Sequence, residues 1–581
     1  MSQRYGTAEA YDRFLSYDEA PEMLVIDDFS SGMAKDTALL LNMEVKGKSL
    51  ISVAMPEDAV YEGGFAEGSV TDAAYADGVF LFRKGRTLYA LKDGAFFVVG
   101  TEGMLTEDRG AIYDCDQRFY VIDGEYIYVV ERGLSITLME QSVPVCLTGL
   151  SRSGAYYTEV APMNPFCRYI DMWLSDEEGN EQLFPLSFAV DNTYARAWHK
   201  DGTEVYNGYV MLREDRVIFD GDDAAGCRLR LRLSDSEDAS VYSFSSSAEY
   251  REIVGKSGTA FPVSLSDGTV MLLTANGTEI IGVSLPDGFG AHSTQNLVRY
   301  DCLQDITDIV PFDDGYLVFF EDAVKKLSIK DGTDGISFSV TSFQNDFGSD
   351  MKGSIVCFDD KIVFASAKEG IFCIDRFGIS EKVGRRKISA NIEEGEYGFF
   401  SHTAEEYESA SGFAAFGKYY LSVGAVTYVW DHRAKLPTGT QTHAHEAAMI
   451  WYLTDTIRPE KYLAFLAGGL YYTERDTGKL RYLKRSGGSV ASKMQTAELD
   501  LGSCGEKTLI GFGMRYRSSG TVSVSVICDG KVFPDTYHFP ASENFVSREI
   551  RTYGKRFEKI SLFTECEGKT EMDAIIFRFL L

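Results

Sequence analysis

The chain has 581 residues, 45% of them hydrophobic and 13% aromatic, and its 57 basic and 87 acidic side chains leave a formal charge of −30. A chain of this length predicts two to four domains, each with a well-filled core. The acidic balance repels phosphate, which excludes a protein that grips nucleic acid but not one that surrounds DNA without holding it.

The ten cysteines form neither a Cys-x-x-Cys pair nor a zinc-finger spacing. Several of them, including Cys357 and Cys373, lie in apolar runs, which predicts free buried thiols in a protein made in a reducing compartment. The first residues lack the apolar core of a signal peptide, and no apolar run is long enough for a membrane helix. We therefore expect neither secretion nor a membrane-spanning segment.

The first part of the chain runs from a polar terminus into a β-rich region. Residues 1–24 are expected to form an arm that serves assembly or is a frayed terminus, and an extended lead-in segment follows from Met23 to Val53. Candidate meanders then occupy residues 73–99 and 111–130, each with strands of alternating pattern joined by an Asp-Gly turn, a strong hairpin signal.

The regular succession of meander patterns is interrupted between about residues 156 and 250. Within this stretch, residues 227–233 alternate arginine with leucine, so one face of the predicted strand is charged and the other is buried. This pattern is typical of a small β-sandwich exposed on one side. Its arginines, Arg228, Arg230 and Arg232, either form a solvated face or contact an anionic partner.

Meanders resume after the insertion and bring the total to about seven modules. They lie at residues 261–284, 309–329, 354–377, 413–431 and 462–483. One such meander cannot bury both of its faces, whereas several arranged around an axis can, which predicts a propeller.

The character of the chain changes again from Lys493. Apolar runs at residues 508–516, 521–528, 557–564 and 575–580 are separated by polar links, the pattern of a terminal β-sandwich. The sequence therefore predicts an all-β protein, a β-propeller of about seven blades with two sandwich domains. The expected domains are an N-terminal arm (1–24), a first propeller part (25–155), an inserted β-sandwich (156–250), a second propeller part (251–492) and a C-terminal β-sandwich (493–581).

Motifs for nucleotide and metal binding are incomplete. The Gly-Lys-Ser tripeptides at 47–49 and 255–257 lack the earlier glycine of a phosphate-binding loop, because Asn42 and Tyr250 stand in its place. His443 and His445, followed by Glu446, could face a metal from a strand. Their surroundings are typical of a loop without a nearby cysteine, so no metal ligand is predicted.

Catalytic motifs are equally incomplete. Residues 149–154 have the wrong spacing for a nucleophile elbow, residues 331–335 favour a turn over a calcium loop, and the basic run 382–387 lacks aromatic residues and is interpreted as a charged loop. An acid pair for glycoside hydrolysis cannot be selected among 87 carboxylates. The sequence thus predicts no catalytic, cofactor-binding or metal-binding residue, and no enzyme.

The order of features between about Asp305 and Lys507 is similar to that of β-propeller proteins of tailed-phage virions, the tail-hub or nozzle class. The runs that carry the resemblance are residues 306–320, 353–364, 369–374, 419–423, 428–431, 449–453, 470–473, 478–480 and 495–502. The resemblance implies a structural virion protein, made in the bacterial host cytoplasm, in a tail hub, nozzle or head-to-tail connection. It implies no cofactor and no catalytic residue.

The expected partners follow from that resemblance: adaptor, portal or tail components, and copies of the chain in a homo-oligomeric ring around or near a DNA channel. An acidic channel wall would let DNA slide without sticking. The arm and the two sandwiches are the parts outside the propeller that are free to build the ring. A bacterial carbohydrate-binding or glycoside-processing propeller is the main alternative, and a general interaction scaffold is the third.

Overall fold

The computed structural model describes most of the chain, and the chain divides into two compact units. Unit 1 comprises Met1–Val60 and Ser349–Leu581, and unit 2 comprises Tyr61–Gly348. The described residues are 22–27, 37–106, 110–115, 117–139, 143–147, 159–160, 164, 166–173, 182–185, 189–205, 210–213, 216–219, 227–238, 243–248, 251, 259–264, 270–275, 280–284, 292–299, 304, 306–312, 315–332, 335–345, 347–359, 361–377, 382–432, 450–466, 468–484, 490–501 and 505–581.

The described part of unit 2 contains four antiparallel sheets of four strands, each a meander. Their tight turns follow from the sequence: in the Asp77-Gly78 and Asp93-Gly94 turns both residues have positive φ, the geometry that two-residue hairpin turns require. The strands are β6 (Val70–Ala76), β7 (Val79–Lys84), β8 (Thr87–Lys92) and β9 (Ala95–Val99); β10 (Ala111–Cys115), β11 (Arg118–Ile122), β12 (Ile127–Glu131) and β13 (Ile136–Leu138); β22 (Thr259–Ser264), β23 (Val270–Ala275), β24 (Ile280–Ser284) and β25 (His292–Arg299); and β26 (Ile306–Phe312), β27 (Gly315–Phe320), β28 (Ala323–Gly332) and β29 (Gly335–Asn345).

The inserted module of unit 2 has two small sheets. One consists of β14 (Val145–Leu147), β15 (Glu159–Val160), β16 (Tyr169–Trp173), β18 (Val190–Trp198) and β21 (Arg228–Leu233), and the other of β17 (Gln182–Pro185), β19 (Val210–Arg213) and β20 (Arg216–Phe219). The alternation predicted for β21 is confirmed, because Leu229 and Leu231 are fully buried while the arginines that alternate with the leucines are partly exposed.

Unit 1 holds three further meanders of four strands. The last one is completed by β5, a short strand from far earlier in the chain, which pairs with β40. The strands are β30 (Val356–Phe358), β31 (Lys361–Ser366), β32 (Gly370–Phe377) and β33 (Lys382–Lys387); β34 (Ser411–Ala415), β35 (Lys418–Val423), β36 (Val426–Asp431) and β37 (Ile450–Thr454); and β38 (Pro459–Leu466), β39 (Gly469–Glu474), β40 (Leu480–Lys484) and β5 (Glu57–Asp58). Seven four-stranded meanders among the described residues confirm the predicted β-propeller.

The C-terminal β-sandwich of unit 1 takes strands from both ends of the chain. One sheet contains β1 (Glu22–Ile26), β3 (Met43–Lys46), β4 (Ser49–Ser52), β42 (Lys507–Ser518), β45 (Ser542–Phe557) and β47 (Thr570–Leu580); the other contains β41 (Ser492–Thr496), β43 (Val522–Cys528), β44 (Lys531–Phe539) and β46 (Ile560–Cys566). The lead-in segment, expected to open the propeller from residue 25, therefore supplies sandwich strands instead. The arm proposed for residues 1–24 lies outside the described residues up to residue 21.

Two strands of this sandwich were interpreted as polar links. β44 and β45 each form an end of their sheet, and most of their side chains are exposed. A strand that buries neither face completely shows no alternation of apolar and polar residues. The predicted charged loop at 382–387 is likewise wrong, because it forms β33, the outer strand of its blade.

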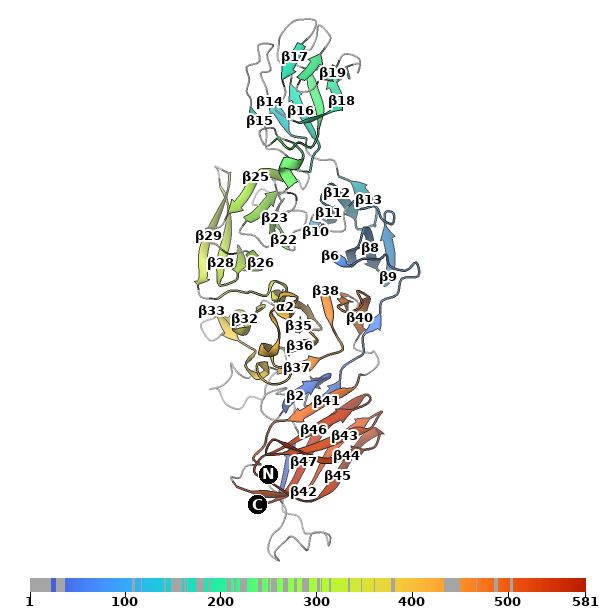
Figure 1. Cartoon of the computed structure of the whole chain (residues 1–581), viewed down its shortest axis with the longest axis vertical. Helices are drawn as coiled ribbons and strands as arrows, with labels where there is room; N and C mark the ends of the chain where they lie inside the picture. Colours follow the sequence, from blue (N-terminus) through green and yellow to red (C-terminus); the bar gives the residue numbers. More distant parts are fainter. Residues whose placement is uncertain are drawn as a thin grey trace, which may run out of the picture. The chain divides into compact units, whose positions relative to one another are not determined.

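A continuous sheet joins the blade β34–β37 to the sandwich. Strand β2 (Thr37–Leu41) pairs in parallel with β37 through Leu41 and Leu453 and antiparallel with β41 (Figure 1). Asn42 follows β2 with a left-handed φ of 57° and is buried. Its side-chain amide donates to Asp455 Oδ1 (2.8 Å) and to the carbonyl of Ala491 (2.9 Å), so one residue links the blade, β2 and β41.

The core of unit 1 is rich in large aromatic side chains, and several of their polar atoms are hydrogen-bonded. Trp430 and Trp451 are fully buried and stacked, with ring centroids 6.3 Å apart. Trp451 Nε1 donates to the carbonyl of Ile388 (2.7 Å), and the Tyr419 hydroxyl donates to that of Ser354 (2.7 Å). These bonds remove the cost of burying the polar ends of the rings.

Helices are few among the described residues. They are the α-helix α2 (Ala404–Glu408), helical residues at Ala248 and Arg251, and the 3₁₀ turns Ser245–Ser247, Lys352–Ser354, Ala390–Ile392 and Phe399–Ser401. In the described part of the chain, no helix combines the length and the apolarity needed to cross a membrane.

The cysteine prediction is confirmed in part. None of the described cysteines forms a disulfide. Cys115, Cys167, Cys227, Cys373, Cys528 and Cys566 are buried thiols, and Cys357 is an exposed one. Burial raises the pKa of the Cys167 and Cys566 thiols to about 11. Cys357 was expected inside because its run is apolar, but side chains alternate along β30, and its side chain is on the more exposed face.

Candidate functional site

A cavity of about 470 Å³ lies within unit 1, between the blades and the C-terminal sandwich. This volume is in the range of small-molecule sites. Its lining comes from strands far apart in sequence: Glu44, Lys46, Ile51, Ser52, Val53, Ala54, Phe416, Lys418, Tyr420, Tyr452, Thr454, Ile457, Leu483, Lys484, Arg517, Ser518, Ser519, Ser542, Glu543, Lys569, Thr570 and Glu571.

Lys418 is the buried charge of this cavity. Only 5% of the surface of Lys418 is exposed. Its ammonium contacts the Glu44 carboxylate of β3, lies 3.1 Å from the Tyr452 hydroxyl and 3.6 Å from Asp431 Oδ2. A lysine so deeply buried stays charged only when carboxylates compensate it. The pair with Glu44 therefore joins a blade strand to a sandwich strand across the cavity.

The phenols beside Lys418 are held in their neutral form. Burial strongly raises the pKa values of Tyr420 and Tyr452. Neither phenol therefore offers an anionic oxygen near neutral pH, and both serve as hydrogen-bonding groups with apolar rings. This favours binding over nucleophilic chemistry in the cavity.

The rim of the cavity is basic. Lys46, Lys484, Arg517 and Lys569 line it from four elements and are exposed. Arg517 is paired with Glu571, with Nε 2.8 Å from Oε2, and Lys484 lies 4.6 Å from the ring centroid of Tyr482. Within the described residues, no carboxylate lies within ion-pair distance of Lys46 or Lys569.

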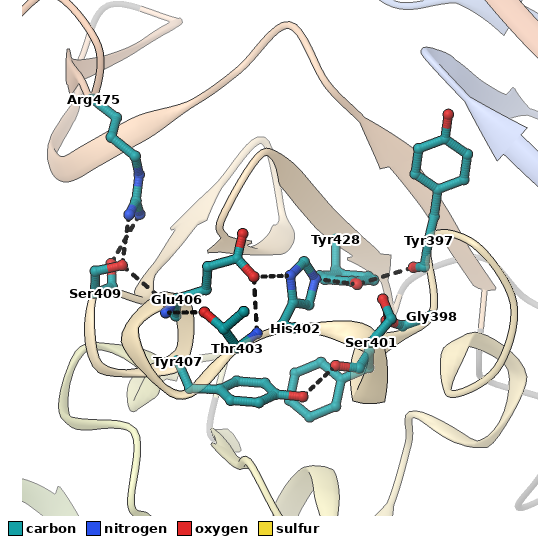
Figure 2. A network of polar contacts seen from close by, with 11 residues as sticks. Tyr397, Gly398, Ser401, His402, Thr403, Glu406, Tyr407, Ser409, Tyr428 and Arg475 are labelled. Atoms are coloured by element: carbon teal, nitrogen blue, oxygen red, sulfur yellow. Dashed lines mark hydrogen bonds and ion pairs between the residues drawn. The ribbon is translucent and has the colours of Figure 1, made fainter.

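A second polar cluster in unit 1 surrounds His402. Figure 2 shows its imidazole between the Glu406 carboxylate (Nδ1 to Oε2, 3.1 Å) and the Tyr428 hydroxyl (Nε2, 2.8 Å). Tyr428 is fully buried, burial raises its pKa, and its hydroxyl also donates to the carbonyl of Tyr397 (3.0 Å). A histidine between a carboxylate and a hydroxyl is the arrangement of an activated nucleophile.

The contacts of the His402 cluster are nevertheless structural. Glu406 also accepts the backbone amide of Thr403 (2.9 Å), which completes a capping box at the start of α2. The Tyr428 hydroxyl is buried and already donates its proton to the carbonyl of Tyr397. The cluster therefore ties the loop before α2 to β36, and we assign it no catalytic role.

The arginines of β21 have partners within their own module. Arg230 forms two hydrogen bonds to Asp171, at 2.7 and 2.9 Å, and lies 5.5 Å from the Trp198 ring centroid. Arg232 lies 3.6 Å from Asp191. The face is thus neither a bare solvated surface nor a free basic strip, because carboxylates in neighbouring strands compensate it.

The remaining sequence candidates are placed as follows. Gly47 and Lys48 form the turn of the β3–β4 hairpin, with Gly47 at a φ of +64°, and Ser49 begins β4. Of residues 331–335, Asp331, Gly332 and Gly335 lie at the paired ends of β28 and β29, and the other two lie outside the described residues. The second Gly-Lys-Ser tripeptide at 255–257, residues 149–154, and the cluster of His443, His445 and Glu446 lie outside the described residues.

Buried carboxylates in the described part of the chain are used structurally. Asp123 accepts from the backbone and hydroxyl of Thr106 (both 3.0 Å) and from the Tyr126 amide (2.8 Å), and Asp171 holds Arg230. No group of three or more His, Cys, Asp or Glu residues suited to a metal ion occurs among the described residues.

Comparisons with known proteins do not identify a relative. No family model and no curated protein matches the chain. The chain is similar to solved structures of Sqt1 from Saccharomyces cerevisiae (8% identity, 74% of this chain and 98% of that chain, TM-score 0.34), the Pan2 WD40 domain from Neurospora crassa (7%, 71% and 88%, 0.31) and the computationally designed Ika8 protein (9%, 72% and 97%, 0.29). Since these TM-scores are low, the fold assignment rests on the strand pairing.

Proposed function

We propose that this protein is a structural component of a tailed bacteriophage or prophage virion, in a tail hub, nozzle or head-to-tail connection. The order of features between Asp305 and Lys507 supports this role. The observation that carries the proposal is the continuous sheet from blade β34–β37 through β2 into the C-terminal sandwich.

A continuous sheet is an unusual joint between modules. Modules in one chain are commonly joined by exposed linkers and move relative to each other. Here main-chain pairing, the Asn42 amide bonds and the Lys418–Glu44 ion pair all cross the same joint. A protein that holds its place under the forces of DNA packaging and ejection needs such a joint, whereas a freely acting enzyme does not.

The distribution of charge supports the same role. Residues 493–581 contain twelve basic and twelve acidic residues, so the whole charge of −30 belongs to residues 1–492. A C-terminal region without net charge avoids the long-range repulsion that would oppose docking onto other copies or partner proteins. The acidic remainder has the charge of a surface along which DNA slides without binding.

Mass spectrometry of purified particles tests the proposal directly. We expect the protein in virions of the phage that encodes it, at a fixed copy number relative to the portal protein, and at the neck or tail in labelled electron micrographs. Particles from a deletion mutant should lack normal tails, and expression of the intact chain should restore them. Absence of the protein from infectious particles would contradict the proposal.

The proposal includes the absence of catalytic turnover, which separates it from a glycoside-processing propeller. Screening the purified protein against polysaccharides and ester substrates should give no hydrolysis. A hydrolytic rate abolished by substituting one carboxylate, for example Glu543→Gln in the cavity, would establish the enzyme alternative.

A further inference from the structure

The cavity of unit 1 has a charge opposite to that of the protein. The chain carries −30, yet basic residues outnumber acidic ones on the rim, where Lys46, Lys484, Arg517 and Lys569 face Glu543 and Glu571. A local reversal of sign against the field of a whole protein concentrates anions at that place. Lys46 and Lys569, which form no ion pair within the described residues, are the groups free to bind one.

The lining between rim and floor offers hydroxyl groups. Ser52, Thr454, Ser518, Ser519, Ser542 and Thr570 line the cavity. All of these hydroxyl groups except that of Ser519 already have hydrogen-bond partners in the protein. For example, the Ser518 hydroxyl bonds that of Thr570 (2.8 Å). Ser519 Oγ accepts from the Lys569 amide (2.9 Å), which leaves its proton for another acceptor. Ser519 and Lys569 thus contribute a hydroxyl donor and an exposed ammonium group to the lining.

The remaining lining is apolar and aromatic. Phe416, Tyr420 and Tyr452 contribute rings, and Ile51, Val53, Ile457 and Leu483 contribute aliphatic surface. Aromatic side chains suit ligands with one apolar and one polar side. A sugar ring is such a ligand, since its C–H face packs on rings while its hydroxyls meet serine and threonine.

We propose that this cavity binds an acidic sugar, a carboxylate on a hydroxylated ring such as a hexuronic acid. Lys46 and Lys569 hold the carboxylate at the rim, Ser519 and its neighbours bond the ring hydroxyls, and the aromatic lining packs on the ring. The Lys418–Glu44 pair forms a fixed, neutral part of the wall. This site is independent of a virion role, because the residues that form it belong to unit 1 alone.

Isothermal titration of the full-length protein with glucuronate and galacturonate tests the site. We expect saturable binding with about millimolar or tighter dissociation constants, weakened by salt because the carboxylate contacts are exposed. Glucose, which has the same ring without the carboxylate, should bind at least tenfold more weakly. Acetate and sulfate, which have the charge without the ring, should compete poorly.

Charge reversal separates this site from general attraction. Lys46→Glu with Lys569→Glu should weaken glucuronate binding at least tenfold. The matched control, Lys531→Glu with Arg548→Glu, makes the same charge change in exposed sandwich residues outside the cavity and should leave binding unchanged. Thermal midpoints of both variants check folding.

Three results would overturn the proposal. Equal affinity for glucose and glucuronate would show that the rim charges take no part. Equally effective competition by acetate or sulfate would mean an adventitious ion only. No saturable binding of either uronate, or equal loss in both double variants, would show that the cavity is not the site.

Discussion

At the residue scale, the joint of unit 1 depends on a buried ion pair. Lys418→Met leaves Glu44 without its cation in a site where only about a quarter of that side chain is exposed. Breaking a buried pair in this way costs about 3 kcal/mol, more than removing both charges. We expect Lys418→Met to lower the free energy of unfolding by about that amount, and the double variant Glu44→Gln/Lys418→Met to recover part of it.

Urea unfolding followed by tryptophan fluorescence measures this effect, because Trp430 and Trp451 lie in the core of unit 1. Lys484→Met is the control, since it removes an exposed lysine from the same cavity and should change stability by less than about 0.5 kcal/mol. Equal losses in the two single lysine variants would show that burial of Lys418 has no special cost.

A second residue-scale prediction concerns Glu406 and acid. The hydrogen bond from the Thr403 amide lowers the pKa of Glu406 below its ordinary value, and His402 lowers it further. A carboxylate with a depressed folded-state pKa stabilises the fold above its unfolded pKa of about 4.3, and this contribution is lost as pH falls through the folded-state value.

Thermal midpoints of the wild type and Glu406→Gln, measured from neutral pH down to about pH 3, should therefore differ most near neutrality and converge in acid. Glu405→Gln removes a charge from the neighbouring position of α2 without touching His402, and its difference from the wild type should change less with pH. If the difference in thermal midpoint between the wild type and Glu406→Gln instead increased in acid, the folded-state pKa of Glu406 would be raised and not lowered, which would contradict the role given to this carboxylate.

At the element scale, the blades of unit 1 approach each other through glycine. A Cβ on Gly353 would lie 2.1 Å from the carbonyl oxygen of Ala410, just before β34. Because the obstacle is backbone, neither side can yield cheaply, and overpacking of this kind costs about 1–3 kcal/mol.

We expect Gly353→Ala to lower the thermal midpoint clearly. Gly133→Ala is the control, because a Cβ there meets nothing within 4 Å and its φ is not positive. Calorimetry of the two variants checks the prediction. Similar midpoints would show that the contact between the 3₁₀ turn Lys352–Ser354 and β34 can relax.

The sequence predicted those strands in which burial of one face imposes a regular order of apolar and polar residues. The blades and the Arg-Leu alternation of β21 follow from local periodicity, because each strand buries a defined face. β44 and β45 were missed because edge strands bury little. β5 could not be predicted, since two residues, Glu57 and Asp58, carry no periodicity and their pairing with β40 spans most of the chain.

The cavity could not be predicted for a related reason. Its charged pair joins Glu44 to Lys418 across 374 positions of sequence. Each of its residues looks like an ordinary strand or turn residue, and only the pairing of β2 with β37 and β41 brings them together. In the sequence, Asn42 was informative only because it stands where a phosphate-binding loop requires glycine. Its left-handed conformation and its hydrogen bonds across the joint could not be predicted.

At the scale of the whole molecule, assembly into the proposed ring is a balance between repulsion and docking. Residues 1–492 carry all of the net charge, whereas residues 493–581 have none and include the exposed edge strands β44 and β45. Salt screens this repulsion, so that its range falls to about 10 Å at 0.1 M salt. We therefore expect the isolated chain to be monomeric at low salt and to associate as salt rises, through the sandwich.

Mass photometry across a salt series measures this association. Val532 on β44 is 65% exposed, and Val532→Lys places a charge on that edge, a device that natural edge strands use to block pairing. Association of this variant should be weaker at every salt concentration. Lys531→Arg next to it keeps the charge and should associate as the wild type does.

The same balance predicts the role of the N-terminal residues in particles. β1 pairs with β47 inside the sandwich, so deletion of residues 1–21 keeps every sandwich strand while removing the polar segment before it. If that segment completes the ring contact, the truncated chain should fold with an unchanged thermal midpoint, associate less in high salt and enter particles in reduced amount when it competes with the intact chain. Incorporation equal to that of the intact chain would restrict assembly to the sandwich and leave the first residues as a frayed terminus.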